Sequence, residues 1–342
     1  MGKADMNYIM IKSAVENGFK DVLENPARSI RKLVDLGLLF SGGDNQRNFF
    51  DIASRELEND KSLYYNLAER ITRSMNHDKL LSFGMNFGYN ALIKGAATIR
   101  SIEEKLNFNI PWCLLFDGIS GQDITIKNIA AVLEQGIELG IFTYFFRLNK
   151  DFGSIDDLIE LFEEKEDCAF VLLVHPSQIN SGFVERCINV KNLCIFMQLD
   201  DMKPEITRNG AQLLSNSNLL RGGFINAENY SNANETMKYA DILDLPLFIF
   251  MNENADKPDF SKEGRQQVNN MRLNLPYPVF PVDFYSDIEY IDKNISSTTC
   301  LSVIFDDGSI KAGGSQHFNI KETPLKNIFS SSMPRKKLRV YP

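Results

Sequence analysis

Hydrophobic positions in the first hundred residues recur at three- and four-residue spacing, which is the pattern of amphipathic helices. Apolar side chains from Tyr8 to Val22 share one face of a predicted helix that stops at Asn25-Pro26. A second predicted helix starts at Pro26 and ends at Ser41-Gly42-Gly43. The remaining predicted helices cover residues 49–57, 63–71 and 77–106, the last with a break near Gly88. The sequence therefore predicts an all-helical N-terminal region over residues 1–108.

From residue 109 onward, apolar runs rich in aromatic and β-branched residues alternate with helical patterns. The runs predict strands at 112–116, 142–146, 170–174, 193–197, 222–225 and 247–251. The predicted helices between them cover 124–139, 155–164, 178–187, 205–214 and 235–243. Strands joined through helices need crossover connections, so we expect a parallel sheet. We predict an α/β fold with a partial (β/α)6 TIM-like barrel over residues 109–285; the spacing alone leaves a sheet covered on both faces open.

The end of the chain predicts antiparallel structure. A further strand is expected at 280–284, followed by a hairpin of strands 301–305 and 309–311. Asp307-Gly308 supplies the residue types of a tight hairpin turn between them. Residues 286–342 are therefore predicted to form a small C-terminal extension.

Charge changes the picture of possible partners. The chain has 342 residues, 44% of them hydrophobic and 24% charged, with a net charge of −8. Residues 111–310 hold 15 Lys+Arg against 30 Asp+Glu, which argues against a nucleic-acid groove because phosphate binding needs clustered basic residues. Residues 311–342 are basic, and a flexible terminus is favoured there over an anionic-surface anchor. Arg28, Arg31 and Lys32 would let the second helix lie on a membrane surface, but a helix packed on the neighbouring domain is favoured.

The apolar segments and the cysteine spacing indicate the cellular compartment of the protein. The apolar run 169–174 is far shorter than a membrane-spanning helix, and the N-terminus lacks the apolar core of a signal peptide. We therefore expect a cytoplasmic protein. The five cysteines at positions 113, 168, 187, 194 and 300 form no CxxC or zinc-binding spacing, so we expect reduced and mostly buried thiols.

Several short segments of residues 83–332 match the motifs of a known protein family. They are the stretch Phe83-Gly84-Met85-Asn86-Phe87-Gly88-Tyr89-Asn90, the segment Asn109-Ile110-Pro111-Trp112 before the first strand, and the order of the later elements. In the C-terminal region they are Cys300, Asp306-Asp307-Gly308, Ala312-Gly313-Gly314, and Asn319-Ile320 before Leu325-Lys326-Asn327-Ile328-Phe329. With these segments the chain resembles radical S-adenosylmethionine (radical SAM) proteins with a SPASM or twitch C-terminal extension. The resemblance covers most of residues 83–332 and implies a radical-SAM-like barrel followed by a small β-hairpin/helix extension.

The residues that perform the chemistry of this family are missing. The family holds a four-iron cluster on CxxxCxxC after its first strand, where this chain reads Asp117-Gly118-Ile119-Ser120-Gly121-Gln122-Asp123 without a cysteine. Its glycine-glycine-glutamate segment is replaced by Phe146-Arg147-Leu148-Asn149-Lys150, and Cys300 alone remains for an auxiliary cluster. We therefore expect a degenerate member that has lost both S-adenosylmethionine and the 4Fe-4S cluster and has no cofactor.

Polar side chains nevertheless follow the predicted strands, at the ends where parallel α/β folds bind ligands. The candidate binding residues are Asp117, Arg147, His175, Asp200, Asp201, Asn226 and Asn252, the last with Glu253 beside it. In one hypothesis Asp117, Asp200 and Asp201 hold a divalent metal, with His175 as a ligand or general base. The other interpretation is a solvated polar rim in which His175 caps the helix that begins at Pro176.

Two functional hypotheses follow. The favoured one is a non-catalytic binding or scaffold protein with a protein partner, either an intact radical SAM enzyme or its peptide or lipid substrate. The alternative is an enzyme with new metal-assisted hydrolase or lyase chemistry at the barrel mouth, with His175 and Asp200 in catalytic roles. The sequence leans toward a pseudoenzyme.

Overall fold

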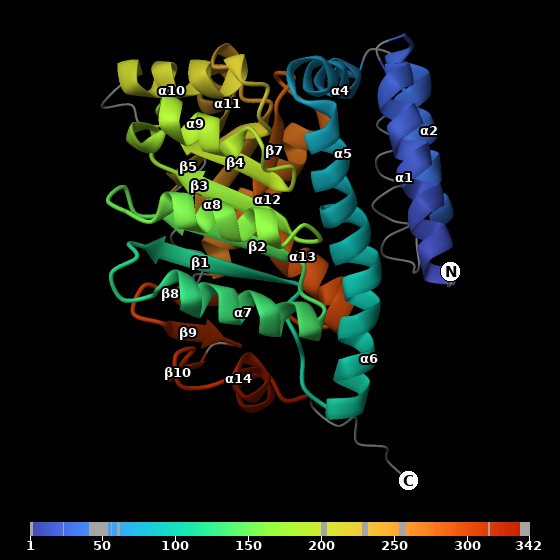
Figure 1. Cartoon of the computed structure of the whole chain (residues 1–342). Helices are drawn as coiled ribbons and strands as arrows, with labels where there is room; N and C mark the ends of the chain where they lie inside the picture. The colour runs from blue at the N-terminus through green and yellow to red at the C-terminus, as the bar shows by residue number, and fades with distance from the viewer. Residues whose placement is uncertain are drawn as a thin grey trace. The chain divides into compact units, whose positions relative to one another are not determined.

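A computed structural model describes residues 3–22, 24–40, 54–55, 57–59, 62–199, 204–227, 232–252, 258–313 and 315–335 (Figure 1). The chain divides into two compact units. The first unit comprises residues 1–85 and 173–287, and the second unit comprises residues 86–172 and 288–342. Strand β3 (Ala169–Val174) and helix α13 (Phe284–Ser296) each run across the division. The predicted domain limits at residues 108 and 285 stay a prediction.

In the second unit, the first predicted strand and the C-terminal hairpin belong to the same sheet. Its strand order is β10-β9-β8-β1-β2, in which β8 and β2 lie parallel to β1, while β9 is antiparallel to both of its neighbours. The elements are η1 (Asn86–Gly95), α6 (Ala96–Leu106), β1 (Cys113–Ile119), α7 (Ile126–Leu139), β2 (Thr143–Leu148), α8 (Ile155–Glu164), β8 (Ser302–Phe305), β9 (Ser309–Ala312), β10 (Ser315–Asn319) and α14 (Leu325–Ser332). The predicted strands and the turn at Asp307-Gly308 are confirmed.

The first unit repeats strand and helix in alternation after its N-terminal helices. Strands β4 to β7 pair in sequence order, and every pair is parallel. The elements are α1 (Lys3–Val22), α2 (Pro26–Phe40), α4 (Leu63–Ser74), α5 (His77–Met85), η2 (Pro176–Gln178), α9 (Ser181–Cys187), β4 (Leu193–Gln198), α10 (Pro204–Asn216), β5 (Arg221–Ala227), α11 (Ala233–Ile242), β6 (Leu247–Asn252), α12 (Pro258–Leu273) and β7 (Phe280–Asp283). The fold class is therefore mixed α/β with parallel strands and surrounding helices, as the sequence predicts. Closure of the strands into a partial barrel stays a prediction.

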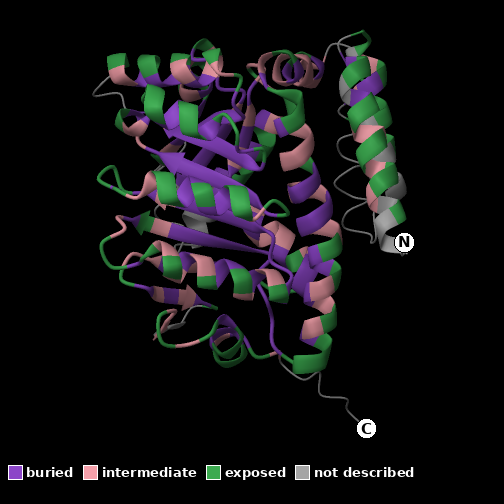
Figure 2. Ribbon diagram, in the orientation of Figure 1, coloured by how far each residue is buried: buried purple, intermediate pink, exposed green. Residues whose placement is uncertain are grey.

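The strands form the buried core, and the helices turn exposed faces outward (Figure 2). All six residues of β3 are buried, as expected for parallel strands with both faces covered. In the second unit, the rings of Phe116 and Phe146 stack at a centroid distance of 4.5 Å. Phe162 of α8 stacks on Phe170 of β3 at 4.1 Å. Aromatic packing of this kind adds about 0.5–1.5 kcal/mol per pair beyond the area that it buries.

The predicted break near Gly88 is a π-helical segment instead. Residues Asn86–Gly95 form the π-helix η1 between α5 and α6. Asn86 donates its side-chain amide to the carbonyl of Cys168 at 2.8 Å, and Asn90 donates to the carbonyl of Asp167 at 3.0 Å. These two asparagines satisfy backbone carbonyls just before β3, which gives the Asn86-to-Asn90 stretch a structural role. Most of the predicted third helix, 49–57, lies outside the described residues.

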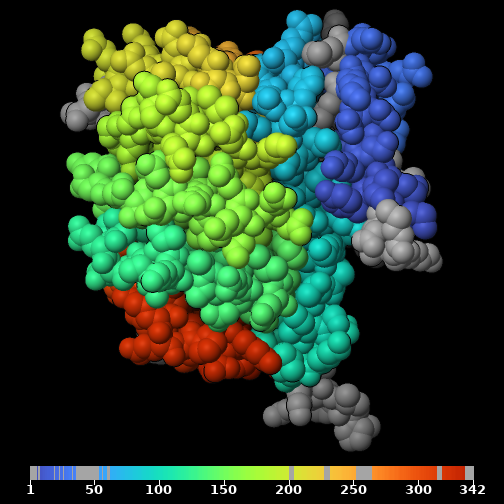
Figure 3. Space-filling view, in the orientation of Figure 1, coloured from blue at the N-terminus to red at the C-terminus, as the bar shows by residue number. Residues whose placement is uncertain are grey.

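The C-terminal extension packs within the second unit. Helix α14 lies beside α7, and the backbone N–H of Leu325 donates to Oε1 of Gln135 at 2.8 Å (Figure 1). In the space-filling view, the C-terminal segment covers the surface next to the region of α7 (Figure 3). The helices among the described residues include none with the length and apolar character needed to span a membrane.

Candidate functional site

Two of the candidate residues meet at the carboxyl ends of β1 and β2. Asp117 and Arg147 are direct partners in the parallel register of these strands. Arg147 Nη2 donates to Asp117 Oδ2 at 2.9 Å, and Nε donates to Oδ1. Their side chains are 26% exposed for Arg147 and 12% exposed for Asp117. The result is a two-point guanidinium–carboxylate pair, which is the strong geometry for such contacts.

The loop after β1 is fastened to the C-terminal extension of the same unit. Asp306, which follows β8, accepts the backbone N–H of Ser120 at 2.9 Å and that of Gly121 at 3.2 Å on Oδ1. The hydroxyl of Ser120 donates to Oδ2 of the same carboxylate. Lys321 adds a further bond, from Nζ to the carbonyl of Asp123 at 3.2 Å. We call the contact of Asp306 with Ser120 and Gly121 the Asp306 clamp.

Glycine allows the chain to make this loop. Gly118 has φ +68° and Gly121 has φ +76°, which are left-handed values that favour glycine. A Cβ at Gly121 would lie 3.0 Å from the ring of Phe152. The loop backbone is therefore set by its own glycines and by the Asp306 clamp.

His175 lies in the first unit, at the end of β3, where its contacts are local. Its Nδ1 accepts the backbone N–H of Ser177 at 3.2 Å and lies 2.7 Å from the Ser177 hydroxyl. Its own backbone N–H donates to Gln178 Oε1 at 2.9 Å, which completes a capping box on the short helix η2. The helix-capping interpretation of His175 is confirmed, whereas its role in catalysis stays a prediction.

The other candidate residues contribute less to a described site. Asn226 is exposed near the end of β5 in the first unit. Asp200, Asp201 and Glu253 lie outside the described residues, and the side chain of Asn252 does too. The structure therefore brings together Asp117 and Arg147 within one unit.

The five cysteines are buried, and burial raises the pKa of four of them. All five are buried, with at most 2% of each residue exposed. Burial raises the pKa of Cys168 and of Cys194 to about 12, and it raises the pKa of Cys113 and Cys300 well above the usual range. The thiols at these four positions are therefore protonated at neutral pH. Across the described ranges, no three His, Cys, Asp or Glu side chains are grouped so that they would hold a metal ion.

The residues present do not fit a four-iron cluster at the β1 loop. The segment 117–123 supplies carboxylate, hydroxyl and amide groups but no thiol. Its carboxylate at Asp117 is paired with Arg147, and its backbone N–H groups at Ser120 and Gly121 are bound by Asp306. The loop therefore lacks the thiolate ligands of a four-iron cluster.

Sequence reasoning missed Asp306 as part of this arrangement. The sequence marks Asp306-Asp307-Gly308 as a turn, and Asp307 does serve the turn by accepting the N–H of Ser309 at 2.8 Å. Asp306 bonds to a loop 186 residues earlier in the chain, and no local pattern reports a contact at that separation. The parallel pairing of β8 with β1 brings the two together.

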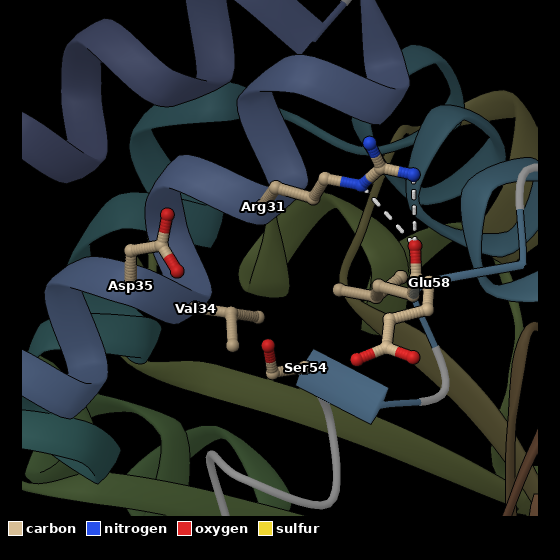
Figure 4. Close-up of a pocket in the computed structure, with 6 residues that line it drawn as sticks. Arg31, Val34, Asp35, Ser54 and Glu58 are labelled. Atoms are coloured by element: carbon tan, nitrogen blue, oxygen red, sulfur yellow. Dashed lines mark hydrogen bonds between the residues drawn. The ribbon is translucent and has the colours of Figure 1, made fainter.

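A cavity of about 340 Å³ lies in the N-terminal helices of the first unit (Figure 4). Arg31, Val34 and Asp35 of α2 line it together with Ser54, Leu57 and Glu58. Arg31 points across it and donates from Nε and Nη2 to the carbonyl of Leu57 at 3.1 and 3.0 Å. Arg31 thus joins α2 to the segment before α4, while the packing of α2 on the neighbouring domain stays a prediction.

Comparisons with known proteins give structural similarity alone. No protein-family model and no curated protein matches the chain. Streptococcus suis SuiB bound to precursor peptide SuiA is 12% identical, with a TM-score of 0.48 over 83% of this chain and 82% of that one. SuiB bound to S-adenosylmethionine is 14% identical, with a TM-score of 0.47 over 90% and 81%. An Aquifex aeolicus protein is 12% identical, with a TM-score of 0.39 over 62% and 88%.

With TM-scores below 0.5, these similarities carry no conclusion about the activity, cofactors or partners of this chain. The class that the fold itself defines is a mixed α/β protein with parallel strands. Its best-defined site is the β1 loop, held by the Asp117–Arg147 pair and the Asp306 clamp.

Proposed function

We propose that this chain is a non-catalytic, radical-SAM-like protein that acts as a binding or scaffold subunit. The observation that carries the proposal is the Asp306 clamp. A loop that binds a cluster must direct its coordinating side chains toward the cluster. In this loop, the N–H groups of Ser120 and Gly121 instead donate to a carboxylate of the same chain. The loop is thereby a structural connection between β1 and the C-terminal extension.

The Asp117–Arg147 pair supports the same proposal and weakens the metal-enzyme alternative. Both carboxylate oxygens of Asp117 accept hydrogen bonds from Arg147, so a metal ion would have to displace a two-point ion pair. Arginine keeps its charge at all ordinary pH values and would repel a divalent cation beside it. Asp117 is therefore a poor metal ligand in this arrangement.

A protein partner is part of the proposal. The chain retains an α/β fold and an acidic central region of 30 Asp+Glu against 15 Lys+Arg over residues 111–310. Such a charge excess favours association with a basic surface and disfavours nucleic acid. We propose that the partner is an intact radical SAM enzyme or its peptide or lipid substrate, that no cofactor is bound, and that the protein works in the cytoplasm.

Calorimetric titration of the purified full chain tests the non-catalytic assignment. We expect no saturable heat on adding S-adenosylmethionine, and none on adding Mg²⁺, Mn²⁺ or Zn²⁺ separately. A cooperative thermal melt of the same sample serves as the control for folding. Saturable binding of S-adenosylmethionine would contradict the loss of the family's cofactor. Saturable metal binding that disappears in Asp117→Asn would instead favour the metal-enzyme alternative.

A further inference from the structure

A buried carboxyl group on α13 lies outside the site described above. Asp292 is 1% exposed. Its Oδ2 accepts the backbone N–H of Cys300 at 2.8 Å. Its Oδ1 is buried and has no hydrogen-bond partner among the described residues. A carboxylate in such surroundings is costly, because burial removes water without supplying a counter-charge.

The titratable groups that act electrostatically on Asp292 are an acid and two thiols. Glu103 of α6, which is also 1% exposed, and the thiols of Cys113 in β1 and Cys300 before β8 interact with it electrostatically. Arg100 and Arg335 act on Glu103 and lower its pKa, but burial outweighs them and raises it. The cluster is therefore a pair of buried acids with two neutral thiols beside it.

Glu103 and Asp292 each bind the backbone just before a strand of the second unit. Glu103 Oε1 accepts the backbone N–H of Ile110 at 2.9 Å, just before β1. Asp292 binds the N–H of Cys300, just before β8. Ser296 of α13 donates to the carbonyl of Ile110 at 3.1 Å and joins the two halves. The pair thus fastens the starts of β1 and β8, which lie parallel and adjacent in the second unit.

We propose that Glu103 and Asp292 form a pH-sensitive latch that holds the start of β8 against β1 in acid and releases it as the pH rises through neutrality. A neutral carboxyl group tolerates burial, whereas the ionised form of Asp292 is disfavoured by loss of water and by the charge of Glu103. The latch therefore loosens the C-terminal extension, including the Asp306 clamp, when Asp292 loses its proton. The inference does not depend on the proposed function.

The direction of the effect follows from proton linkage. Burial raises the pKa of Asp292 from 3.8 to about 7, although the hydrogen bond from the backbone N–H of Cys300 lowers it and the charge of Glu103 raises it further. Between pH 3.8 and about 7, Asp292 keeps its proton in the folded state and has released it in the opened state. Stability is therefore highest at low pH, falls as the pH rises from about 4 to about 7, and levels off above that range.

Hydrogen exchange of the backbone amides of residues 302–305 tests the latch in the full chain. For the wild type, the protection factor, which is corrected for the intrinsic rate, is expected to fall about 50-fold between pH 5 and pH 7. Asp292→Asn keeps an acceptor for the Cys300 N–H but removes the titration, so its protection is expected to change less than about threefold. Glu160→Gln, at an exposed acid of α8, is the matched control and should behave as the wild type.

Two results would overturn the inference. One is a wild-type protection factor that is constant between pH 5 and pH 7. The other is an equal pH dependence in the wild type and Asp292→Asn. If Asp292→Asn does not fold, Glu103→Gln takes its place: a smaller change than in the wild type supports the latch, and an equal change contradicts it.

Discussion

Asp117 and Arg147 face each other across adjacent parallel strands and are joined by two hydrogen-bonded contacts at the ends of β1 and β2. The Asp117 side chain is 12% exposed, so the pair is shielded from solvent more than an ordinary surface ion pair. At such a position the pair stabilises the strand ends and occupies the carboxylate that a metal ion would need. This relationship leads to the first prediction.

A double-mutant cycle measures the strength of this pair. We expect Asp117→Ala and Arg147→Ala each to lower the free energy of unfolding by about 1–3 kcal/mol, because the remaining partner loses its hydrogen bonds while partly buried. The coupling energy is expected to be about 1–2 kcal/mol by urea denaturation. The Lys165–Glu134 pair of the same unit, with Glu134 66% exposed, is the control and should couple by under about 1 kcal/mol. Equal coupling in the two pairs would contradict this prediction.

The Asp306 clamp predicts a local change on substitution. Asp306→Ala removes the acceptor for the N–H groups of Ser120 and Gly121, and we expect their amide exchange to speed up by about tenfold or more. Asp307→Ala is the matched control, because Asp307 binds Ser309 in the hairpin turn instead. Unchanged exchange of Ser120 and Gly121 in Asp306→Ala would show that the carboxylate does not hold the loop.

Thiol reactivity tests the burial of the cysteines. With the pKa of Cys168 and Cys194 raised to about 12, the thiolate fraction at pH 8 is on the order of 10⁻⁴, and all five thiols are shielded. We expect negligible labelling of the native chain by an aromatic disulfide reagent and five reactive thiols in urea. Rapid labelling of a thiol before unfolding would place that cysteine at the surface.

Asp244 in the first unit predicts a loss of stability in acid. It lies between Arg70 and the fully buried Arg221, and Ser215 donates to it at 2.7 Å. Burial raises its pKa, but the hydrogen bond from Ser215 and the charge of Arg221 outweigh burial, so the pKa is lowered from 3.8. Its contribution is thus complete above pH 3.8 and is lost as the pH falls through the folded-state value.

Asp244→Asn isolates this charge, since asparagine also tolerates the left-handed φ of 56° at this position. We expect a loss of about 2–4 kcal/mol in urea denaturation at pH 7, because Arg221 is left buried with a neutral partner. The difference from the wild type should shrink as the pH is lowered toward 3. A difference that is independent of pH would show that packing, and not the charge, is responsible.

The fold was largely predictable because the buried strands are continuous apolar runs. The run at residues 169–174 and the Asp307-Gly308 turn are local signals, and both appear in the structure. Three elements were not predicted because they carried no strong local signal. They are the polar strand β10 and the helices α12 and α13. The π-helix η1 was not predicted either, because its stabilising contacts come from Asn86 and Asn90 to a distant loop.

The site was predictable in part. Parallel pairing explains why Asp117 and Arg147, 30 residues apart, meet at the strand ends where the sequence places them. The contributions of Asp306 and Ser120 depend on the pairing of β8 with β1, which joins the two ends of the second unit. Residue spacing contains no information about such a contact.

The iron and acid-labile sulfide content of the full chain, purified and reconstituted without oxygen, tests the central claim most directly. The claim is that the β1 loop is structural and that no cluster is held. We predict iron and sulfide far below one cluster per chain, with no charge-transfer absorption from iron–thiolate bonds. Stoichiometric iron and sulfide in a folded sample would contradict the account and restore the chemistry of the family that the sequence resembles.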